Sequence, residues 1–324
     1  MRLRHRASRT RTAAVAAVLS GVALAGCGEV ANTIVPQAGT ANQVTIALAG
    51  PPDAFYAGIY EAQARGYFAQ TDINVHILVP TAGQDAVSMV HGGQALVGVA
   101  SEPSVLLHRN TDEPVVGVAA LVHGPLSSIT IAVPKPGPSG GNAVTTSTTT
   151  TGTKTATAST TPVTTTSTTP ATTTTTPTTT TVSEPDSALW PAALQQLLSQ
   201  PGAPTYDGLV LVVRKGSIVD HAGLVRRFVQ AVGRGYRAAK ADPQRAINDL
   251  VAAVPSLDSS KALQLNTLDA AMPYIFPAGL KIWGWQREAE WNTFGTWMIT
   301  NHLLTNPNAI TDASTNELLQ AQGV

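Results

Sequence analysis

The chain carries little charge and has no excess of either sign. Its 324 residues include 20 Lys and Arg and 20 Asp and Glu, so the formal net charge is zero and charged residues make up 12%. After the first dozen residues, the basic side chains are scattered. A protein that binds nucleic acid needs a basic face against the phosphates, so nucleic acid is not an expected partner.

Cysteine is almost absent. The single cysteine, Cys27, can form no disulfide within the chain, so the fold must be stable through packing alone. No C-x-x-C, H-E-x-x-H or G-x-x-x-x-G-K-[ST] pattern occurs, and the seven histidines are dispersed. We therefore expect no metal site, no cofactor and no enzymatic activity.

The N-terminus has the pattern of an export signal. Five arginines lie within the first eleven residues, and the apolar run "AAVAAVLSGVALAG" (13–26) follows. This run is shorter than a membrane-spanning helix requires and is typical of a signal peptide. We predict that residues 1–26 are a cleaved secretory signal.

The signal ends in "LAGC", which resembles a bacterial lipobox, with small residues before a cysteine that becomes lipidated. Cys27 would then be the new N-terminus, held to the outer face of a bacterial membrane, with residues 27–43 as a tether. Each buried CH₂ of an acyl chain contributes about 0.8 kcal/mol, so two or more chains give durable anchoring. The alternatives are a plain signal peptide with an accidental cysteine and a buried free thiol.

From Val44 onward the pattern is α/β. Apolar runs at 44–50, 73–79, 95–100 and 115–122 predict strands, and helix signals at about 54–65, 85–91 and 103–109 lie between them. Alternating strands and helices favour a mainly parallel sheet flanked by helices.

The C-terminal half adds one strand and several helices. The run "GLVLVV" (208–213) predicts a strand, and Asp220, Asp242 and Asp258 each precede a helical pattern. Trp291, Phe294, Trp297 and Met298 form a stripe at helical spacing, which is typical of a core-facing helix.

Two loops carry the candidate ligand-binding residues. They follow the first and third predicted strands, and in a parallel sheet both lie at the edge where ligands bind. Each runs into a helix N-terminus, which favours anionic or polar groups. The candidates are Asp53, Phe55 and Tyr56 in the first loop, and Ser101, Glu102 and Ser104 in the second.

Each candidate has an alternative explanation. Ser101 and Asp53 would serve equally as helix caps, and Phe55 as a core residue. Trp283, in the loop "KIWGWQ", is a further candidate for the wall of a site, with core packing as its alternative.

Several longer stretches resemble a known family. They are "YAGIYEAQARGYFAQTDINVHIL", "GGQALVGVASEPSVLLHR", "PVVGVAALVHGPLSSITIAV" and, further on, "TYDGLVLVVRKGSIVDHAGLVRRFVQAVGRGYRAAKADPQRAINDLV". The resemblance is to bacterial ABC-transporter solute-binding proteins, in the branch that includes sulfonate and nitrate receptors and binders of the thiamine pyrimidine precursor. It implies a type 2 periplasmic-binding-protein fold, a small-molecule solute, and separate permease and ATPase partners.

The resemblance also changes the meaning of a Thr-rich tract. Family members have two lobes, and residues 44–135 and 205–324 resemble parts of the first lobe only. Between them lie a Thr/Ser/Pro-rich segment (136–183), which has too few apolar residues to fold, and a predicted short helix within 184–204. We expect that the tract is disordered and that it replaces the second lobe.

Two functions follow as expectations. The first is the membrane-anchored, extracytoplasmic solute-binding component of an ABC importer, for a thiamine pyrimidine precursor or a related nitrogen or sulfur compound. The alternative is a non-transport surface lipoprotein with a degenerate binding lobe and a glycosylated Thr-rich loop. A eukaryotic relative of the fold is an enzyme, but it needs a cysteine-rich motif that this chain does not have.

Overall fold

The computed structural model describes residues 42–81, 83–133 and 179–319, which we call the lobe. The predicted signal peptide, the lipobox with Cys27 and the Thr-rich tract as far as residue 178 lie outside the described residues. The tether was expected to end at residue 43, but strand β1 already begins at Asn42.

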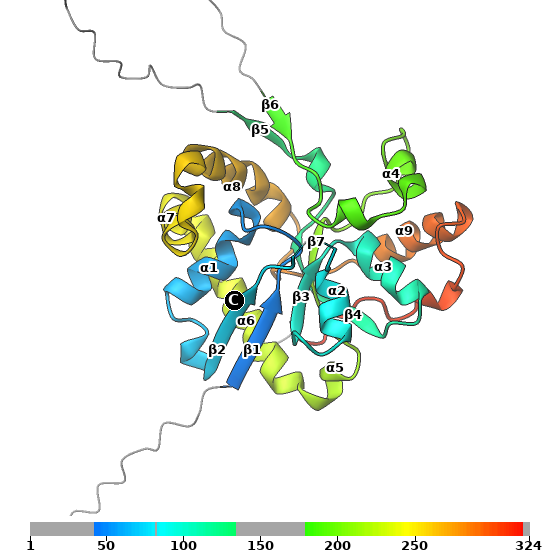
Figure 1. Ribbon diagram of the computed structural model, residues 1–324, viewed down its shortest axis with the longest axis horizontal. Helices are drawn as coiled ribbons and strands as arrows, with labels where there is room; N and C mark the ends of the chain where they lie inside the picture. Colours follow the sequence, from blue (N-terminus) through cyan, green and yellow to red (C-terminus); the bar gives the residue numbers. More distant parts are fainter. Residues whose placement is uncertain (1–41, 82, 134–178, 320–324) are drawn as a thin grey trace, which may run out of the picture. The chain divides into compact units, whose positions relative to one another are not determined.

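A five-stranded sheet forms the centre of the lobe (Figure 1). Its strands are β1 (Asn42–Ala47), β2 (Ile73–Leu78), β3 (Val97–Ala100), β4 (Val115–Val122) and β7 (Leu209–Arg214). Their order is β2-β1-β3-β7-β4. The β1 strand pairs in parallel with β2 and β3, whereas β7 runs antiparallel to both of its neighbours. Four strands therefore point the same way, as the sequence predicts, and the reversed strand is the one that returns from the second half of the chain.

Both faces of this sheet are buried, as β7 illustrates. Leu209, Leu211 and Val213 pack into one hydrophobic cluster, and Val210 and Val212 pack into the other. Successive side chains of a strand point to opposite faces, so a continuous apolar run is what a sheet covered on both sides requires.

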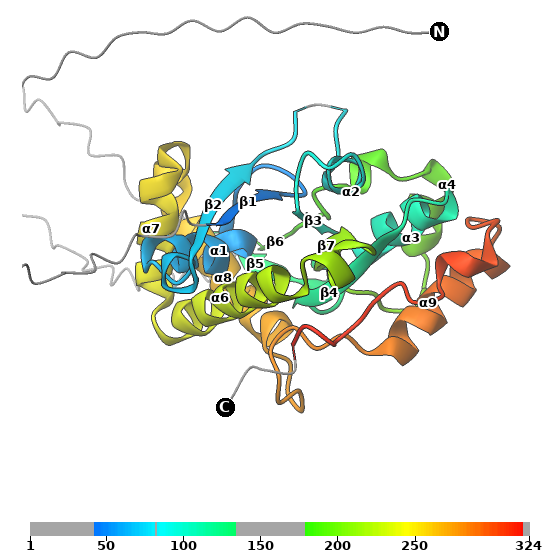
Figure 2. The same cartoon turned by 90° about the horizontal axis from the view of Figure 1, so that it is seen from below.

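Helices cover the two faces in separate groups (Figures 1 and 2). The first group comprises α1 (Ala57–Ala64), α6 (Ala222–Ala241), α7 (Pro243–Ala253) and α8 (Lys261–Ile275). A 3-10 turn at Ala54–Tyr56 leads into α1. The second comprises α2 (Ala86–His91), α3 (Glu102–Asn110), α4 (Ala192–Leu198) and α9 (Glu288–Thr300). A short helix, α5 (Ser217–Asp220), joins β7 to α6.

Several helix starts are the ones expected from the sequence. The carboxylates of Asp85 and Asp242 accept hydrogen bonds from the backbone N–H groups of Ser88 and Arg245, at 2.8 and 3.0 Å. These contacts satisfy donors that the first turn of a helix leaves free. Asp220 is different, because it lies inside α5 and does not cap α6.

Asp258 does not cap a helix either. It lies within a 3-10 turn, Pro255–Ser260, that leads into α8. The stripe on α9 is largely confirmed as core, since Trp291, Phe294 and Met298 are buried and Trp297 is only partly covered.

A separate two-stranded ribbon lies beside the main sheet. It consists of β5 (Thr130–Ala132) and β6 (Thr179–Thr181), which pair antiparallel. The expectation that residues 136–183 are disordered throughout is therefore wrong at its end. Threonine is β-branched and suits an exposed strand, and pairing with β5 satisfies the backbone of this short stretch.

The residues after β6 cross the edge of the main sheet and reach α4. Trp190 and Leu194 are buried in the second cluster, and Leu198 packs partly against it. This part of the chain therefore belongs to the lobe.

Candidate functional site

The carboxyl-terminal edge of the sheet gathers polar side chains from four segments. Asp53 follows β1, Ser101 follows β3 and His123 follows β4. Asp207 precedes β7, which enters the sheet at this same edge because it runs antiparallel. This is the edge at which the sequence predicted a ligand site.

The first loop places Asp53 at the start of the 3-10 turn. Its Oδ1 accepts a hydrogen bond from the Phe55 N–H at 2.9 Å. Burial raises the pKa of Asp53 to about 7, and the Phe55 hydrogen bond lowers it only in part. At neutral pH this carboxyl therefore exists in both its neutral and its ionised form.

The two aromatic candidates beside it are core residues. Phe55 is 1% exposed and Tyr56 is fully buried, so neither presents a ring face to solvent. Tyr236 of α6 fixes this turn, because its hydroxyl donates to the Phe55 carbonyl at 2.6 Å. Burial, followed by the charges of Asp53 and Asp186, raises the pKa of Tyr56 well above its usual value. In this structure Phe55 therefore takes its alternative role as a core residue, and Tyr56 is buried as well.

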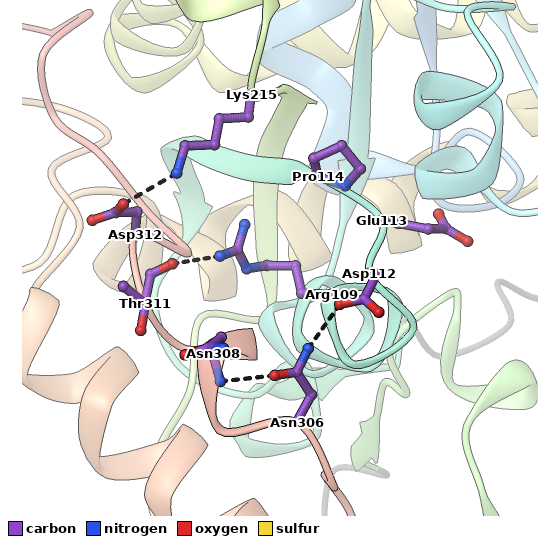
Figure 3. A pocket seen from close by; sticks show the side chains of 9 residues that line it. All are labelled: Arg109, Asp112, Glu113, Pro114, Lys215, Asn306, Asn308, Thr311 and Asp312. Carbon is purple, nitrogen blue, oxygen red and sulfur yellow. Dashed lines mark hydrogen bonds and ion pairs between the residues drawn. The ribbon is translucent and has the colours of Figure 1, made fainter.

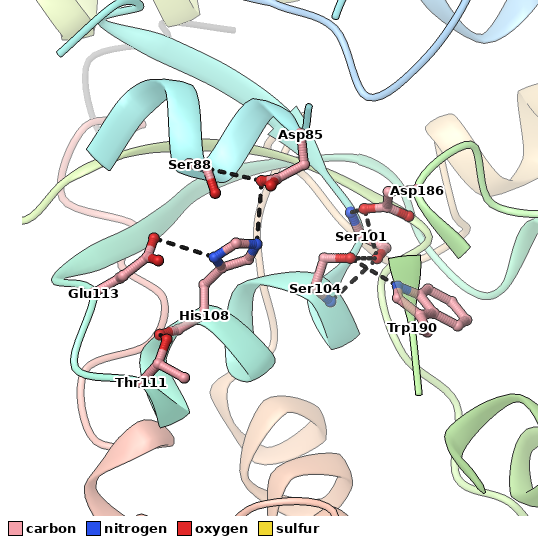
Figure 4. A network of polar contacts seen from close by, with 9 residues as sticks. All are labelled: Asp85, Ser88, Ser101, Ser104, His108, Thr111, Glu113, Asp186 and Trp190. Atoms are coloured by element: carbon pink, nitrogen blue, oxygen red, sulfur yellow. Dashed lines mark hydrogen bonds and ion pairs between the residues drawn. The ribbon is translucent and has the colours of Figure 1, made fainter. Parts of the chain in front are cut away.

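The second loop forms a buried network with a segment that the sequence reasoning missed (Figure 4). The Oδ2 atom of Asp186 accepts from the Ser101 N–H at 2.8 Å and lies 3.0 Å from the Ser101 hydroxyl. The Ser101 and Ser104 hydroxyls lie 3.1 Å apart. The Trp190 indole N–H donates to the Ser104 hydroxyl at 2.7 Å.

Glu102 pairs with Asp207 through their backbones and one carboxylate. The Glu102 N–H donates to the Asp207 carbonyl at 3.0 Å, and Glu102 Oε2 accepts from the Asp207 N–H at 2.8 Å. Glu102 is fully buried. Burial, and then the nearby charge of Asp207, raise the pKa of Glu102 well above its usual value.

Asp207 extends this network toward β4 and α9. Its Oδ1 lies 3.0 Å from His123 Nδ1, and its Oδ2 accepts from the Trp291 indole N–H at 3.2 Å. Both partners are buried. Asp207 thus links three elements of the sheet edge.

Glu184 binds two further groups at this edge of the sheet. Its Oε1 accepts from the Leu126 N–H and from the Tyr206 hydroxyl, each at 2.8 Å. The acidic "EPD" (184–186) after the Thr-rich tract was the only sequence signal for these contacts, and it does not identify their partners.

Trp283 lies in the core, away from Ser101. It is 6% exposed and stacks on Tyr236, with the ring centroids 5.3 Å apart. The structure therefore brings Ser101 and Ser104 together around Asp186, joins Glu102 to Asp207, and places Asp53 on the neighbouring loop. Trp283 and Phe55 pack in the core, and Tyr56 is buried within reach of the charge of Asp186.

A hollow of about 300 Å³ lies beyond the other end of β4 and β7 (Figure 3). Its cationic side chains already have partners. Arg109 donates to the carbonyls of Ala309, Val115 and Thr311, the first two at 2.6 Å. Lys215 pairs with Asp312 at 3.1 Å. These contacts hold the C-terminal segment against α3 and the ends of β4 and β7.

Among residues 42–81, 83–133 and 179–319, no group of three His, Cys, Asp or Glu side chains is arranged to hold a metal ion. Over the same residues, no helix is both long and apolar enough to cross a bilayer.

The model of the NMT1/THI5-like family matches two segments of the chain, residues 54–136 and 194–246. The first segment contains α1 and the Ser101–Ser104 loop, and the second contains β7. Asp186 and Trp190 lie in the unmatched stretch between them.

Curated relatives match a shorter part of the chain. A formylaminopyrimidine-binding protein of Halalkalibacterium halodurans is 34% identical over 86 residues, 26% of each chain. A 4-amino-5-hydroxymethyl-2-methylpyrimidine phosphate synthase of Saccharomyces cerevisiae is 26% identical over 88 residues, 27% of this chain and 26% of the relative. The matches thus span about a quarter of the length of these relatives.

Solved structures share the fold at low sequence identity. The ligand-binding component of an ABC-type import system from Staphylococcus aureus aligns with a TM-score of 0.51 at 11% identity, covering 87% of this chain and 99% of that one. A conserved Candida albicans gene product with the generic periplasmic binding protein fold gives 0.51 at 10% identity, covering 87% and 98%. The chain thus resembles the NMT1/THI5-like family over two matched segments, and its fold is that of the periplasmic binding proteins.

Proposed function

We propose that this chain is the extracytoplasmic solute-binding component of an ABC importer, anchored to the membrane through Cys27, and that its solute is a pyrimidine related to the thiamine precursor. One observation carries the proposal. The family match covers the Ser101–Ser104 loop at the ligand-binding edge of a periplasmic-binding-protein fold. The Halalkalibacterium relative is named for formylaminopyrimidine binding, which supports the choice of solute class. A permease and an ATPase would be separate partners.

The chemistry of the edge supports an aminopyrimidine. Such a ring offers an amino donor beside a ring-nitrogen acceptor. Asp53, with its pKa raised by burial to about 7, can donate as a neutral acid and accept as a carboxylate. A binding role accounts for these groups without a catalytic step, so we propose no enzymatic activity.

A single lobe supplies only one wall of a cleft. The described residues contain one five-stranded sheet and the β5–β6 ribbon, and we propose that the Thr-rich tract replaces a second lobe. Ligand pockets usually bury most of a small molecule, so we expect weak solute affinity unless a partner chain provides the other wall.

Isothermal titration of the full chain with formylaminopyrimidine tests the proposal. We expect weak saturable binding, and an aliphatic sulfonate serves as the comparison solute. Asp53→Asn, which keeps the helix cap and removes the ionisable acid, should weaken pyrimidine binding further. If no heat of binding appears at millimolar pyrimidine, the solute assignment is wrong; sub-micromolar binding by the monomer would instead contradict the single-wall interpretation.

The anchor has its own test. Cys27→Ser should move the protein from the membrane fraction to the extracytoplasmic soluble fraction when the chain is expressed with its signal in a bacterial host. A variant protein that stays with the membrane would contradict lipidation at Cys27.

A second function deserves a test because the Ser101–Ser104 loop is already occupied by the chain's own residues. We propose as the alternative a surface lipoprotein that transports no solute and carries sugars on its Thr-rich tract. Mass spectrometry of the tract would show added hexose masses under this alternative, and the unmodified mass would count against it.

A further inference from the structure

We infer that the Ser101–Ser104 loop is a carboxylate-binding site that the chain fills with its own Asp186. An external solute would then reach the loop only by displacing residues 184–190, which we call the plug. The displacement step rests on the proposed function, whereas the carboxylate site stands on the contacts themselves.

The donors of the site converge on one oxygen atom. Asp186 Oδ2 lies 2.8 Å from the Ser101 backbone nitrogen and 3.0 Å from the Ser101 hydroxyl oxygen. The Ser104 N–H donates to the Ser101 hydroxyl oxygen at 3.3 Å and the Ser104 hydroxyl lies 3.1 Å away, so the Ser101 hydroxyl proton is free to face Asp186. A backbone N–H and a hydroxyl at a helix N-terminus are suitable donors for a carboxylate.

The occupant comes from outside the loop. Asp186 lies 85 positions further along the chain, after the Thr-rich tract, and it is 4% exposed. Trp190 covers the site from the same segment, with its indole N–H on Ser104 and its ring edge-on to Tyr206 at 6.2 Å. The plug therefore brings both a carboxylate and an aromatic ring to the edge where a solute is expected.

Asp186 is bound on one side only. Its Oδ1 atom is buried and has no hydrogen-bond partner among the described residues. A buried oxygen without a partner costs free energy, and burial, although opposed by the Ser101 and Ser104 contacts, raises the pKa of Asp186. A solute that places a hydrogen-bond acceptor on the Ser101 donors and leaves none of its own buried polar atoms without a partner can compete with Asp186.

The plug also fits closely against the first loop. A Cβ atom built on Gly50 would lie 2.7 Å from Pro185 Cβ, so any side chain at position 50 would press on the plug. The backbone of Gly50 needs no left-handed conformation, because Gly50 is not among the glycines with positive φ. Gly50→Ala should therefore loosen the plug without altering Ser101.

Chemical rescue tests the carboxylate site. Asp186→Ala should lower the thermal midpoint, and sodium formate should restore at least half of the loss compared with sodium chloride at equal ionic strength. Asp242→Ala is the matched control, since Asp242 is a solvent-exposed cap whose removal formate should not rescue. Equal midpoints of Asp186→Ala in formate and chloride would overturn the site.

A double-mutant cycle covers the case in which Asp186→Ala does not fold. Asp186→Asn and Ser101→Ala are nearly isosteric, and we expect the unfolding equilibrium constants to show a coupling of about threefold or more. The pair Asp242→Asn and Ser101→Ala should be additive. Additivity in the Asp186 pair as well would overturn the contact.

Displacement is tested by hydrogen exchange of the plug with formylaminopyrimidine as the probe. Added pyrimidine should speed exchange across residues 184–190, and Gly50→Ala should bind it more tightly than the unaltered chain. Binding without faster exchange would overturn displacement and leave the proposed function intact. No binding by the unaltered chain, by Gly50→Ala or by Asp186→Ala would overturn both, whereas formate rescue would still report on the carboxylate site.

Discussion

At the scale of single residues, His108 shows how two carboxylates hold one imidazole (Figure 4). Its Nε2 lies 3.1 Å from Asp85 Oδ1, and its Nδ1 lies 3.1 Å from Glu113 Oε2. Burial lowers the pKa of His108, but the Asp85 hydrogen bond and both negative charges outweigh burial and raise it. The charged imidazole is therefore favoured in the folded state.

We expect His108→Gln to remove a pH-dependent part of the stability. A raised histidine pKa stabilises the fold fully below the ordinary value of 6.5, and this contribution is lost as the pH rises through the folded value. At pH 6 the free energy of unfolding of the unaltered chain should exceed that of His108→Gln by about 1 kcal/mol, a modest value because the site is partly solvated. At high pH this difference should disappear. Urea unfolding over this pH range measures the difference, and His76→Gln, a change at an exposed histidine, is the control.

Asp53 also has a raised pKa, but here the folded state favours the neutral acid and disfavours the charged form. Its pKa rises from 3.8 to about 7 through burial. The stability that this group contributes is full below the ordinary pKa and is lost as the pH rises through the folded value.

Asp53→Asn should keep the hydrogen bond from the Phe55 N–H and remove this loss. We expect the variant and the unaltered chain to be equally stable near pH 4. At pH 8 the variant should be more stable by about 2 kcal/mol, a value reduced for the partial exposure of the side chain. Thermal unfolding at the two pH values measures the difference, and a variant that is less stable at pH 8 would contradict the prediction.

At the scale of elements, α1 and α6 cross at two glycines. A Cβ on Gly58 would lie 2.2 Å from the Tyr236 ring, and one on Gly235 would lie 1.9 Å from the Gly58 carbonyl oxygen. Only glycine permits this approach, which also lets the Tyr236 hydroxyl reach the Phe55 carbonyl. The crossing thus positions the turn that carries Asp53.

Gly235→Ala should separate the two helices and lower the free energy of unfolding by about 3 kcal/mol. Gly223→Ala is the matched control in the same helix, because Gly223 is exposed and its nearest neighbour is a flexible arginine tip at 3.8 Å. The control should gain up to about 1 kcal/mol from helix propensity. If the two variants change the free energy of unfolding in urea by the same amount, the crossing of α1 and α6 does not depend on Gly235.

The elements differ in how far the sequence predicts them. Asp53, Ser101 and Asp242 accept hydrogen bonds at helix starts as their local sequences indicate, because a cap depends on neighbours three or fewer positions away. The contact between Ser101 and Asp186 joins residues 85 positions apart, and no local pattern encodes it. Periodicity also cannot predict that β7 inserts between β3 and β4, or that Tyr56 is buried beside Phe55.

At the scale of the whole molecule, the β5–β6 ribbon holds the two ends of the Thr-rich tract side by side. Ala132 pairs with Thr179, so the tract begins and ends at one place on the lobe. The entropy of closing such a loop grows slowly with length, by about 0.6 kcal/mol per doubling. Each further residue in a tract at this point therefore costs the lobe little additional stability.

Replacing residues 133–178 with Asn-Gly, a favoured two-residue hairpin turn, should raise the free energy of unfolding by about 2 kcal/mol. Chemical denaturation of the shortened and full chains measures the change. A shortened chain that is less stable would show that the removed residues pack against the lobe.

The central place of β7 has a consequence for the order of folding. Strands β3 and β4 are not paired with each other and meet only through β7, which lies about a hundred residues further along the chain. Until Leu209–Arg214 is available, the sheet stops at β3, and β4 has no neighbour in it. Closure over so long a sequence separation is slow, so the sheet stays open during synthesis, or during the export proposed above, until most of the chain is available.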